Sequence, residues 1–274
     1  MRVLKEAERI FQEEDSTVES VVGGILKNTR ESGDEAVVAY TEKFDGFRPS
    51  SLRVEKEAIR AAYEKVSPST VKTLTFAADR IRNFALRQKE CMQDLRYEIS
   101  PGVTLGHRLL PMESCGCYVP AGRYPLPSSA LMSAIPAKVA GVRRIAACSP
   151  AGRAWNGIHP AVLVAMDIAG VDEVYCMGGA QAIGAFAFGT ESVQGVDIIV
   201  GPGNRYVTEA KRQVSGIVGI DMLAGPSEVV IIADESANPE WVAADTLARC
   251  EHDPHSWTVL VTTSRSLAAA IMSS

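Results

Sequence analysis

The chain has 274 residues, of which 46% are hydrophobic, and its formal net charge is -5 with histidine neutral. This length and apolar content predict a folded protein with a sizeable core. Basic and acidic residues are interleaved, so we expect no cationic surface for a nucleic-acid backbone and no DNA or RNA partner. No apolar stretch reaches the roughly 20 residues of a membrane span, and the N-terminus has charges where a signal peptide is apolar. We therefore expect a cytoplasmic protein with no membrane partner.

The first hundred residues are rich in Glu, Lys, Arg and Ala and are predicted to be mostly helical. Apolar residues recur at helical spacing, as they do over 18–25. An Asp-Gly pair at 45–46 indicates a turn, and Ser-Pro-Ser at 67–69 is typical of the start of a long helix. A cluster of helices is therefore expected before any sheet.

From about Val103 onward, short apolar runs alternate with helical stretches. The expected strands lie near 115–120, 143–148, 173–177 and 196–200, and the helices that follow them lie near 129–141, 159–169, 180–188 and 204–215. This alternation is typical of an α/β fold with a parallel sheet covered by helices on both faces.

The pattern then restarts, as if a second sheet were entered. Strands are expected over 229–233 and 258–262, and the helix between them has Asn238 as its predicted N-cap and Pro239 as its first residue. The sequence ends a few residues into a further predicted helix, so we expect an unfinished α/β unit.

The six cysteines lack the spacing of a small disulfide-rich scaffold, and a core of this size does not need disulfides. We expect reduced and mostly buried thiols. Cys115-Gly116-Cys117 has no second Cys/His pair at zinc-ribbon spacing, so this motif is interpreted as structural.

Ligands of open parallel sheets bind beyond the carboxyl ends of the strands, which makes the loops there the first place to search. The first predicted strand ends at Tyr118 and continues into a Pro- and Gly-rich connection and a helix that Ser128 or Ser129 is expected to cap. Small residues let a nucleotide approach the backbone, and Tyr118 can pack on a ring or a sugar. A connection of no special purpose is the alternative.

Two further Gly-rich turns each open a helix at the same predicted edge. They are Gly-Gly-Ala-Gln ending at Gln181 and Gly-Pro-Gly-Asn ending at Asn204. Unpaired N–H groups at a helix N-terminus attract anions, and glycine removes the side chain that would block a pyrophosphate. Neither turn is the six-residue glycine fingerprint of an ordinary dinucleotide fold, but two of them at one edge favour a nucleotide site.

Three polar residues nearer the C-terminus are candidates with two readings each. Ser227 precedes a buried strand and either bonds a ligand or closes a turn. Arg249 and His252 are three residues apart, so they share one face of the helix that begins after Asn238. His252 either serves a site or interacts with the negative end of the helix dipole.

Long blocks of the sequence resemble the histidinol dehydrogenase family, in the order and spacing of that family. The blocks are CYVPAGRYPLPSSALMSAIPAKVAGV at 117–142, GGAQAIGA at 178–185, GPGNRYVTEAKR at 201–212, GIDMLAGPSEVVIIAD at 219–234 and EHDP at 251–254. Carried over by motif, the family's NAD contacts fall on Tyr118, Gln181 and Asn204, which are the strand-end residues selected above.

The resemblance also implies an architecture. Residues 118–226 would form an incomplete Rossmann-like, NAD-binding domain, and residues 1–117 with 227–274 the other incomplete Rossmann-like domain, preceded by N-terminal helices. The family's active site lies between the two, and the family is dimeric, so a homodimer is expected. Ser227, Arg249 and His252 would face a small-molecule alcohol, with His252 as a zinc ligand.

The family reaction is two successive NAD-dependent oxidations, from alcohol through aldehyde to acid, in which L-histidinol becomes L-histidine. Zinc holds the substrate, and a Glu-His pair handles protons and water. That pair, two further zinc ligands and part of the substrate pocket belong to a C-terminal segment of the family that this sequence does not contain. We therefore expect a truncated chain that has no catalytic residue of its own and does not turn over substrate alone.

The sequence departs from the family at Arg249, which replaces a glutamine three residues before His252. A guanidinium has no lone pair for zinc, so either the metal is lost or Arg249 points away and water takes its place. If the side chain of Arg249 points into the site, its guanidinium can pair with an anionic substrate. This would fit the family's zinc-independent relatives that oxidise a sulfonated propanediol. An inactive nucleotide-binding relative and a non-redox enzyme of the same fold are the other hypotheses, and the NAD motif residues argue against the second.

Overall fold

The computed structural model describes residues 3–4, 15–121, 124–152, 154–223, 228–250 and 257–273. The chain divides into two compact units, one of residues 19–223 and one of residues 1–18 with 224–274. Each unit is described by itself. The division into two Rossmann-like domains that the resemblance implies stays a prediction.

The larger unit has helices before and between the strands of a sheet. Its elements in chain order are α1 (Asp15–Asp45), α2 (Lys56–Lys65), α3 (Pro68–Glu90), β1 (Leu95–Ser100), β2 (Val103–His107), β3 (Ser114–Tyr118), α4 (Pro127–Ala140), β4 (Arg144–Ser149), α5 (Pro160–Ala169), β5 (Glu173–Cys176), α6 (Gly179–Phe188), β6 (Ile198–Val200), α7 (Arg205–Val214) and β7 (Gly219–Ile220).

The main sheet has the order β5-β4-β3-β6-β7, and every pair in it is parallel. Cys117 of β3 lies opposite Ala147 of β4 on one side and Val200 of β6 on the other. Counted from β3, this is the 3-2-1-4-5 order of dinucleotide-binding folds, whose direction reverses between the first and fourth strands. The carboxyl ends of β3 and β6 therefore form the topological switch point.

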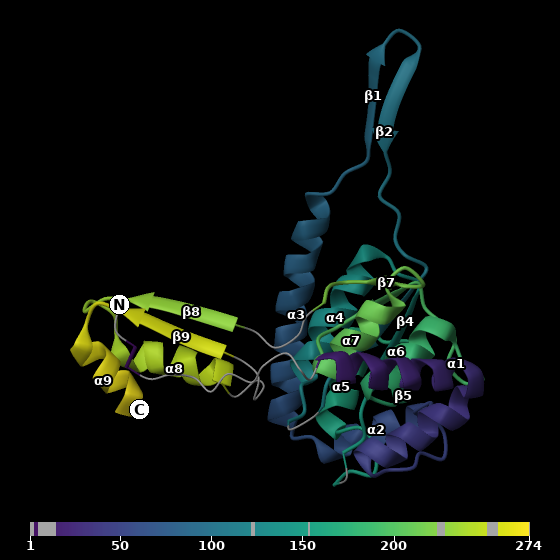
Figure 1. Ribbon diagram of the computed structural model, residues 1–274. Coiled ribbons are helices and arrows are strands. Elements are labelled where there is room, and N and C mark those ends of the chain that lie inside the picture. The colour runs from purple at the N-terminus through teal and green to yellow at the C-terminus, as the bar shows by residue number, and fades with distance from the viewer. Residues whose placement is uncertain are drawn as a thin grey trace. The chain divides into compact units, whose positions relative to one another are not determined.

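Helices cover both faces of this sheet (Figure 1). On one face α4 and α5 pack on β3 and β4, and α2 and α3 pack on those helices in turn. On the other face α6 lies so close that a Cβ at Gly116 would be 2.8 Å from the ring of Phe186. Burial on both faces explains why these strands are almost wholly apolar, and it confirms the predicted α/β class.

Local sequence signals set several helix ends. Ser67 caps α3 by accepting the N–H of Thr70 at 3.1 Å, as predicted. The prediction that Ser128 or Ser129 caps α4 is wrong, because the helix begins earlier, at Pro127, without a side-chain cap. Proline suits a first helical position because its φ is preset and its missing N–H would have no partner there.

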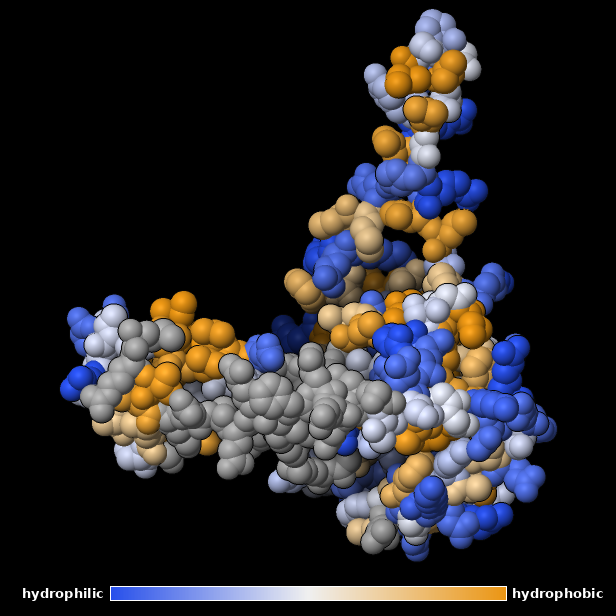
Figure 2. Space-filling view, in the orientation of Figure 1, coloured by the Kyte–Doolittle hydropathy of each residue, from blue (hydrophilic) through white to orange (hydrophobic). Residues whose placement is uncertain are grey.

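The prediction of a mostly helical first hundred residues missed an antiparallel hairpin. Strands β1 and β2 pair through a tight connection at 101–102, where Gly102 has a φ of 80°. All residues of both strands are exposed. The hairpin projects from the rest of this unit, and Figure 2 shows apolar residues along it.

The smaller unit contains a parallel βαβ element of β8 (Glu228–Ala233), α8 (Pro239–Cys250) and β9 (Trp257–Thr262), followed by α9 (Arg265–Ser273). Asn238 accepts the N–H of Glu240 at 2.9 Å, so its predicted role at the start of α8 is confirmed. Helices α8 and α9 pack on β8 and β9. Among the helices that the structure describes, none is long and apolar enough to cross a membrane.

Candidate functional site

Tyr118 links the end of β3 to the start of α6. Its side chain is buried, and its phenol oxygen accepts the N–H of Gly179 at 3.1 Å. That N–H is one of the donors that the first turn of a helix leaves without a partner. Burial raises the pKa of Tyr118, so the phenol stays protonated at neutral pH.

Gln181 lies in the first turn of α6 and is only 1% exposed. Neither its Oε1 nor its Nε2 has a hydrogen-bond partner among the residues that the structure describes. Gly179 has a φ of 64°, a backbone conformation that favours glycine, and a Cβ there would displace the Gln181 Oε1, which would lie 2.7 Å away. A buried amide without partners costs about 1 to 3 kcal/mol, and a polar ligand at this edge would supply them.

Asn204 is the N-cap of α7. Its Oδ1 accepts the N–H groups of Tyr206 at 3.0 Å and Val207 at 3.1 Å, a structural role that the sequence interpretation did not assign. The loop before it lies against β3, because a Cβ at Gly201 would overlap the carbonyl oxygen of Tyr118. The ends of β3 and β6 thus approach each other at the switch point, and Tyr118 and Asn204 belong to the same sheet edge.

An ion pair between a buried lysine and a solvent-accessible aspartate fixes the backbone of that loop. Lys211 of α7, which is 1% exposed, pairs with Asp221 and donates to the carbonyl oxygen of Gly201 at 2.9 Å. Asp221 in turn accepts the N–H of Gly201 at 2.8 Å. Both backbone groups of Gly201 are therefore held, which sets the direction in which the chain enters α7. The sequence interpretation missed this pair, since no local pattern indicates that these two residues contact each other.

Asp45, the last residue of α1, lies at the same edge of the sheet. Residues 52–54 run antiparallel along β5, with the N–H of Cys176 donating to the Leu52 carbonyl at 2.7 Å, and this brings the end of α1 beyond the carboxyl end of β5. The N–H of Ala151 donates to the Asp45 carboxylate, while Oδ2 has no partner among the described residues. Burial raises the pKa of Asp45 to about 6.

Sequence interpretation read Asp45 only as part of a turn. The turn itself is present, since Gly46 has a φ of 67°. Ser149, the last residue of β4, adds another unpartnered group, because its buried Oγ has no hydrogen bond among the described residues. Several buried polar groups near the carboxyl ends of the strands thus have no hydrogen-bond partner within the described part of the chain.

The thiols near the sheet are buried. Cys115, Cys117, Cys148 and Cys176 are buried, as predicted, and the Sγ atoms of Cys115 and Cys117 are 3.9 Å apart. Burial raises the pKa of Cys176 to about 12, so this thiol stays protonated at neutral pH. Within the described part of the chain, no group of three or more His, Cys, Asp or Glu residues could hold a metal ion.

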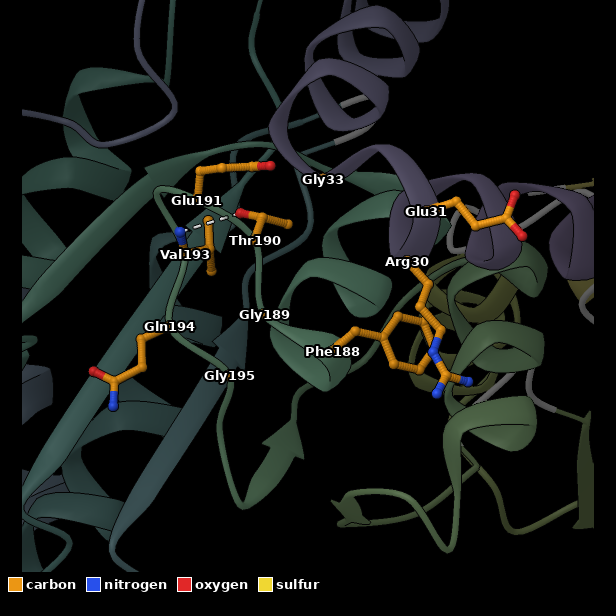
Figure 3. Close-up of a pocket in the computed structure, with 10 residues that line it drawn as sticks. All are labelled: Arg30, Glu31, Gly33, Phe188, Gly189, Thr190, Glu191, Val193, Gln194 and Gly195. Carbon is orange, nitrogen blue, oxygen red and sulfur yellow. Dashed lines mark hydrogen bonds between the residues drawn. The ribbon is translucent and has the colours of Figure 1, made fainter.

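A surface hollow of about 520 Å³ lies elsewhere, between α1 and the loop from α6 to β6 (Figure 3). Arg30 lies over the ring of Phe188, and the N–H of Val193 donates to Thr190 at 3.1 Å. This is the carbonyl end of α6, whose negative dipole disfavours a phosphate. The predicted NAD contacts Tyr118, Gln181 and Asn204 are not among the described residues that line the hollow, so it is no candidate for the nucleotide.

The predicted substrate residues could not be placed with the others. Ser227 and His252 lie outside the described residues. Arg249 is in the last turn of α8, and its side chain also lies outside the description. Their convergence on one substrate site stays a prediction.

The model of the histidinol dehydrogenase family matches residues 9–274. The chain belongs to this family. A histidinol dehydrogenase from Parasynechococcus marenigrum is 52% identical over 257 residues, which are 93% of this chain and 58% of the relative. A histidinol dehydrogenase from Methanocaldococcus jannaschii is 47% identical over 270 residues, which are 97% of this chain and 62% of the relative.

A solved structure agrees with this assignment. The crystal structure of histidinol dehydrogenase from Elizabethkingia anophelis matches with a TM-score of 0.84 and 38% identity, covering 99% of this chain and 60% of that one. The α/β fold with a helix-covered parallel sheet is therefore that of the family. The chain spans about three-fifths of the length of the relatives named here.

Proposed function

We propose that this chain carries the NAD-binding part of an enzyme that oxidises a primary alcohol through an aldehyde to a carboxylate, with L-histidinol as the default substrate. Family membership and the relatives' names support the reaction. The observation that carries the cofactor assignment is Gln181, whose buried amide at the N-terminus of α6 lacks partners among the residues that the structure describes. Tyr118 and Asn204 belong to the same edge, at the switch point where such folds bind nucleotides.

The residues of this edge fit a dinucleotide. Gly178 and Gly179 place no side chain at the very start of α6, so a phosphate can approach the backbone there. The Gln181 amide offers a donor and an acceptor, and the protonated Tyr118 phenol offers a hydroxyl donor. NAD, when bound, accepts a hydride at each oxidation. The chain's own residues bind and orient it.

The overall chemistry balances with two oxidations. The alcohol and one water give a carboxylate, two hydrides and three protons. We assign no proton-handling residue within these 274 residues, because the Glu-His pair that the resemblance implies belongs to a part of the family that the sequence does not contain. No step is derived through zinc, since His252 lies outside the described residues and Arg249 cannot ligate a metal.

A second candidate substrate follows from Arg249, in the last turn of α8 three residues before His252. A guanidinium turned toward the substrate favours a sulfonate or phosphate by bidentate pairing, as in oxidation of an anionic diol. The two candidates are separated by NADH production from the full natural chain, given L-histidinol or a sulfonated propanediol, with added zinc or with a chelator. Zinc-dependent oxidation of histidinol supports the default, and chelator-resistant oxidation of the diol supports the alternative.

A homodimer is also proposed, and sedimentation of the full chain tests it.

The cofactor site is tested at Asn204. Asn204→Ala should weaken NADH binding at least tenfold, measured by fluorescence titration of the full chain. Because Asn204 also caps α7, this variant should lose about 1 kcal/mol of stability. Asn204→Ser is the matched control, since serine keeps the cap but shortens the side chain and removes the amide. Affinity that is unchanged in both variants would remove Asn204 from the site.

A further inference from the structure

The second strand of the sheet lacks the acidic residue expected of its position. In dinucleotide folds with this strand order, a carboxylate near the end of the second strand accepts a hydrogen bond from the adenosine ribose. Here that strand is β4, which ends at Ser149 and continues through Pro150 and Ala151. None of these three residues carries a charge.

Asp45 supplies a carboxylate at this point from a different element. It comes from the end of α1, 106 residues earlier in the chain than Ala151, whose N–H donates to it. It also lies close enough to Tyr118 and Cys176 to interact with them electrostatically. The carboxylate is thus located where β3, β4 and β5 end, next to the residues assigned to the nucleotide.

The position of Asp45 is built into the fold. Helix α1 is interrupted at Gly33, whose φ is 51°, and the N–H of Asp34 after the break donates to Glu191 at 2.7 Å. The Asp34 carboxylate accepts from Thr190 and Ser192 in the same loop. These contacts direct the second half of α1, which ends at Asp45.

The unpartnered oxygen indicates which ligand chemistry fits. A carboxylate offers only acceptors, so the buried Oδ2 needs a donor from outside the described residues. A phosphate or pyrophosphate brings no donor and a like charge, whereas a sugar hydroxyl brings a donor and no charge. Burial raises the pKa of Asp45 to about 6, and a hydroxyl donor would stabilise its charged form.

We propose that Asp45 accepts a hydrogen bond from a ribose hydroxyl of the adenosine half of the cofactor and excludes a 2′-phosphate, which selects NAD over NADP. This inference rests on the proposed function, because it assigns a further contact within the same nucleotide site. Ser149 adds a hydroxyl to the end of β4 but no charge, so the discrimination between NAD and NADP is assigned to Asp45.

The test is calorimetric titration of the full chain with ADP-ribose and with 2′-phospho-ADP-ribose, two probes that differ only at the discriminating group. Asp45→Asn removes the charge and keeps an acceptor for Ala151, and Asp45→Ser removes the charge and shortens the side chain. Asp79→Asn is the matched control, because it removes the same charge from the surface of α3, where Asp79 pairs with Arg82. Near-ultraviolet circular dichroism verifies the fold of each variant.

The parent and Asp79→Asn should bind ADP-ribose at least tenfold more tightly than its 2′-phosphate. In Asp45→Asn and Asp45→Ser, affinity for ADP-ribose should fall about tenfold and the preference should shrink by a similar factor. A preference that is unchanged in both folded Asp45 variants overturns the inference. If Asn204→Ala still binds NADH more weakly than the parent in that case, the proposed nucleotide site is retained. A parent chain that binds neither ADP-ribose nor NADH overturns the proposed function together with this inference.

Discussion

Polar groups at the amino edge of the main sheet are paired within the chain, whereas several buried polar groups at its carboxyl edge have no partner among the described residues. At the amino edge, the first residue of β3 donates from both its N–H and its hydroxyl to Asp197, at 2.8 Å each. The first residues of β4 and β5, Arg144 and Glu173, pair at 3.0 Å. At the carboxyl edge, the amide of Gln181 and the Oγ of Ser149 have no partner among the described residues.

This difference separates folding from function on physical grounds. Polar groups that are needed for the fold are paired within the chain, because a buried group without a partner is costly. Groups that have no partner among the described residues at one edge can still form hydrogen bonds with a ligand. The carboxyl edge is also where open parallel sheets bind nucleotides. The comparison predicts that substitutions at the amino edge affect stability alone, and those at the carboxyl edge affect binding.

The largest expected effect is at Lys211, which stabilises the fold and also positions the carboxyl edge. Lys211→Met leaves Asp221 without its cation and the Gly201 carbonyl without a buried donor, so the free energy of unfolding should fall by about 2 to 3 kcal/mol. NADH affinity should fall as well, because the loop leading to Asn204 loses its anchor. Urea denaturation and fluorescence titration measure the two effects.

The surface pair of Lys138 and Asp172 provides the matched control for this experiment. Its side chains are 45% and 39% exposed, so Lys138→Met should cost less than about 1 kcal/mol and leave NADH affinity unchanged. Equal losses of stability in the two lysine variants would contradict the role assigned to the Lys211–Asp221 pair.

A smaller effect, confined to stability, is expected at the amino edge. Asp197→Ala removes the acceptor of both Ser114 bonds and should lower the free energy of unfolding by about 2 kcal/mol. The folded variant should bind NADH with parental affinity, because the substitution is at the opposite end of the strands. A clear loss of affinity would break the distinction between the two edges.

Local signals predicted most of the main sheet but little of its polar organisation. Strands β3 to β6 and the helices after them were expected within a few residues, because apolar runs and helical spacing are set by burial. The hairpin of β1 and β2 was missed although its strands alternate in polarity and enclose Pro101-Gly102, a pattern that would have indicated it. Its signal was hidden by the helical composition of the preceding segment.

The residues of the candidate site likewise fall into those that local sequence signals predicted and those that they did not. Tyr118, Gln181 and Asn204 were selected because each follows a predicted strand, and parallel strands place their carboxyl ends together. Asp45 was not selected, since its contact with Ala151 depends on the tertiary position of the end of α1. A contact over 106 residues of sequence leaves no local pattern.

The smallest expected effect is the pH dependence of stability at Asp45. Its pKa in the folded protein is about 6, above the ordinary value of 3.8, so the folded state holds this proton more tightly than the unfolded state. Stability should therefore fall as pH rises from about 4 to 6. Tyr118 and Cys176, which interact with the carboxylate, have raised pKa values and stay protonated in this range.

Asp45→Asn removes that titration and keeps an acceptor for Ala151. The variant should gain about 1 kcal/mol over the parent between pH 4 and pH 8, less than the full linkage value because the side chain is only partly buried. Thermal unfolding at both pH values measures the gain, with Asp79→Asn as the control for net charge. A gain of the same size at pH 4 and pH 8 would mean that the Asp45 carboxylate has a satisfied partner, and the carboxyl edge would then resemble the amino edge. A gain confined to the higher pH would mean that the fold tolerates an uncompensated charge at Asp45. Substitution of this same carboxylate should weaken the binding of ADP-ribose.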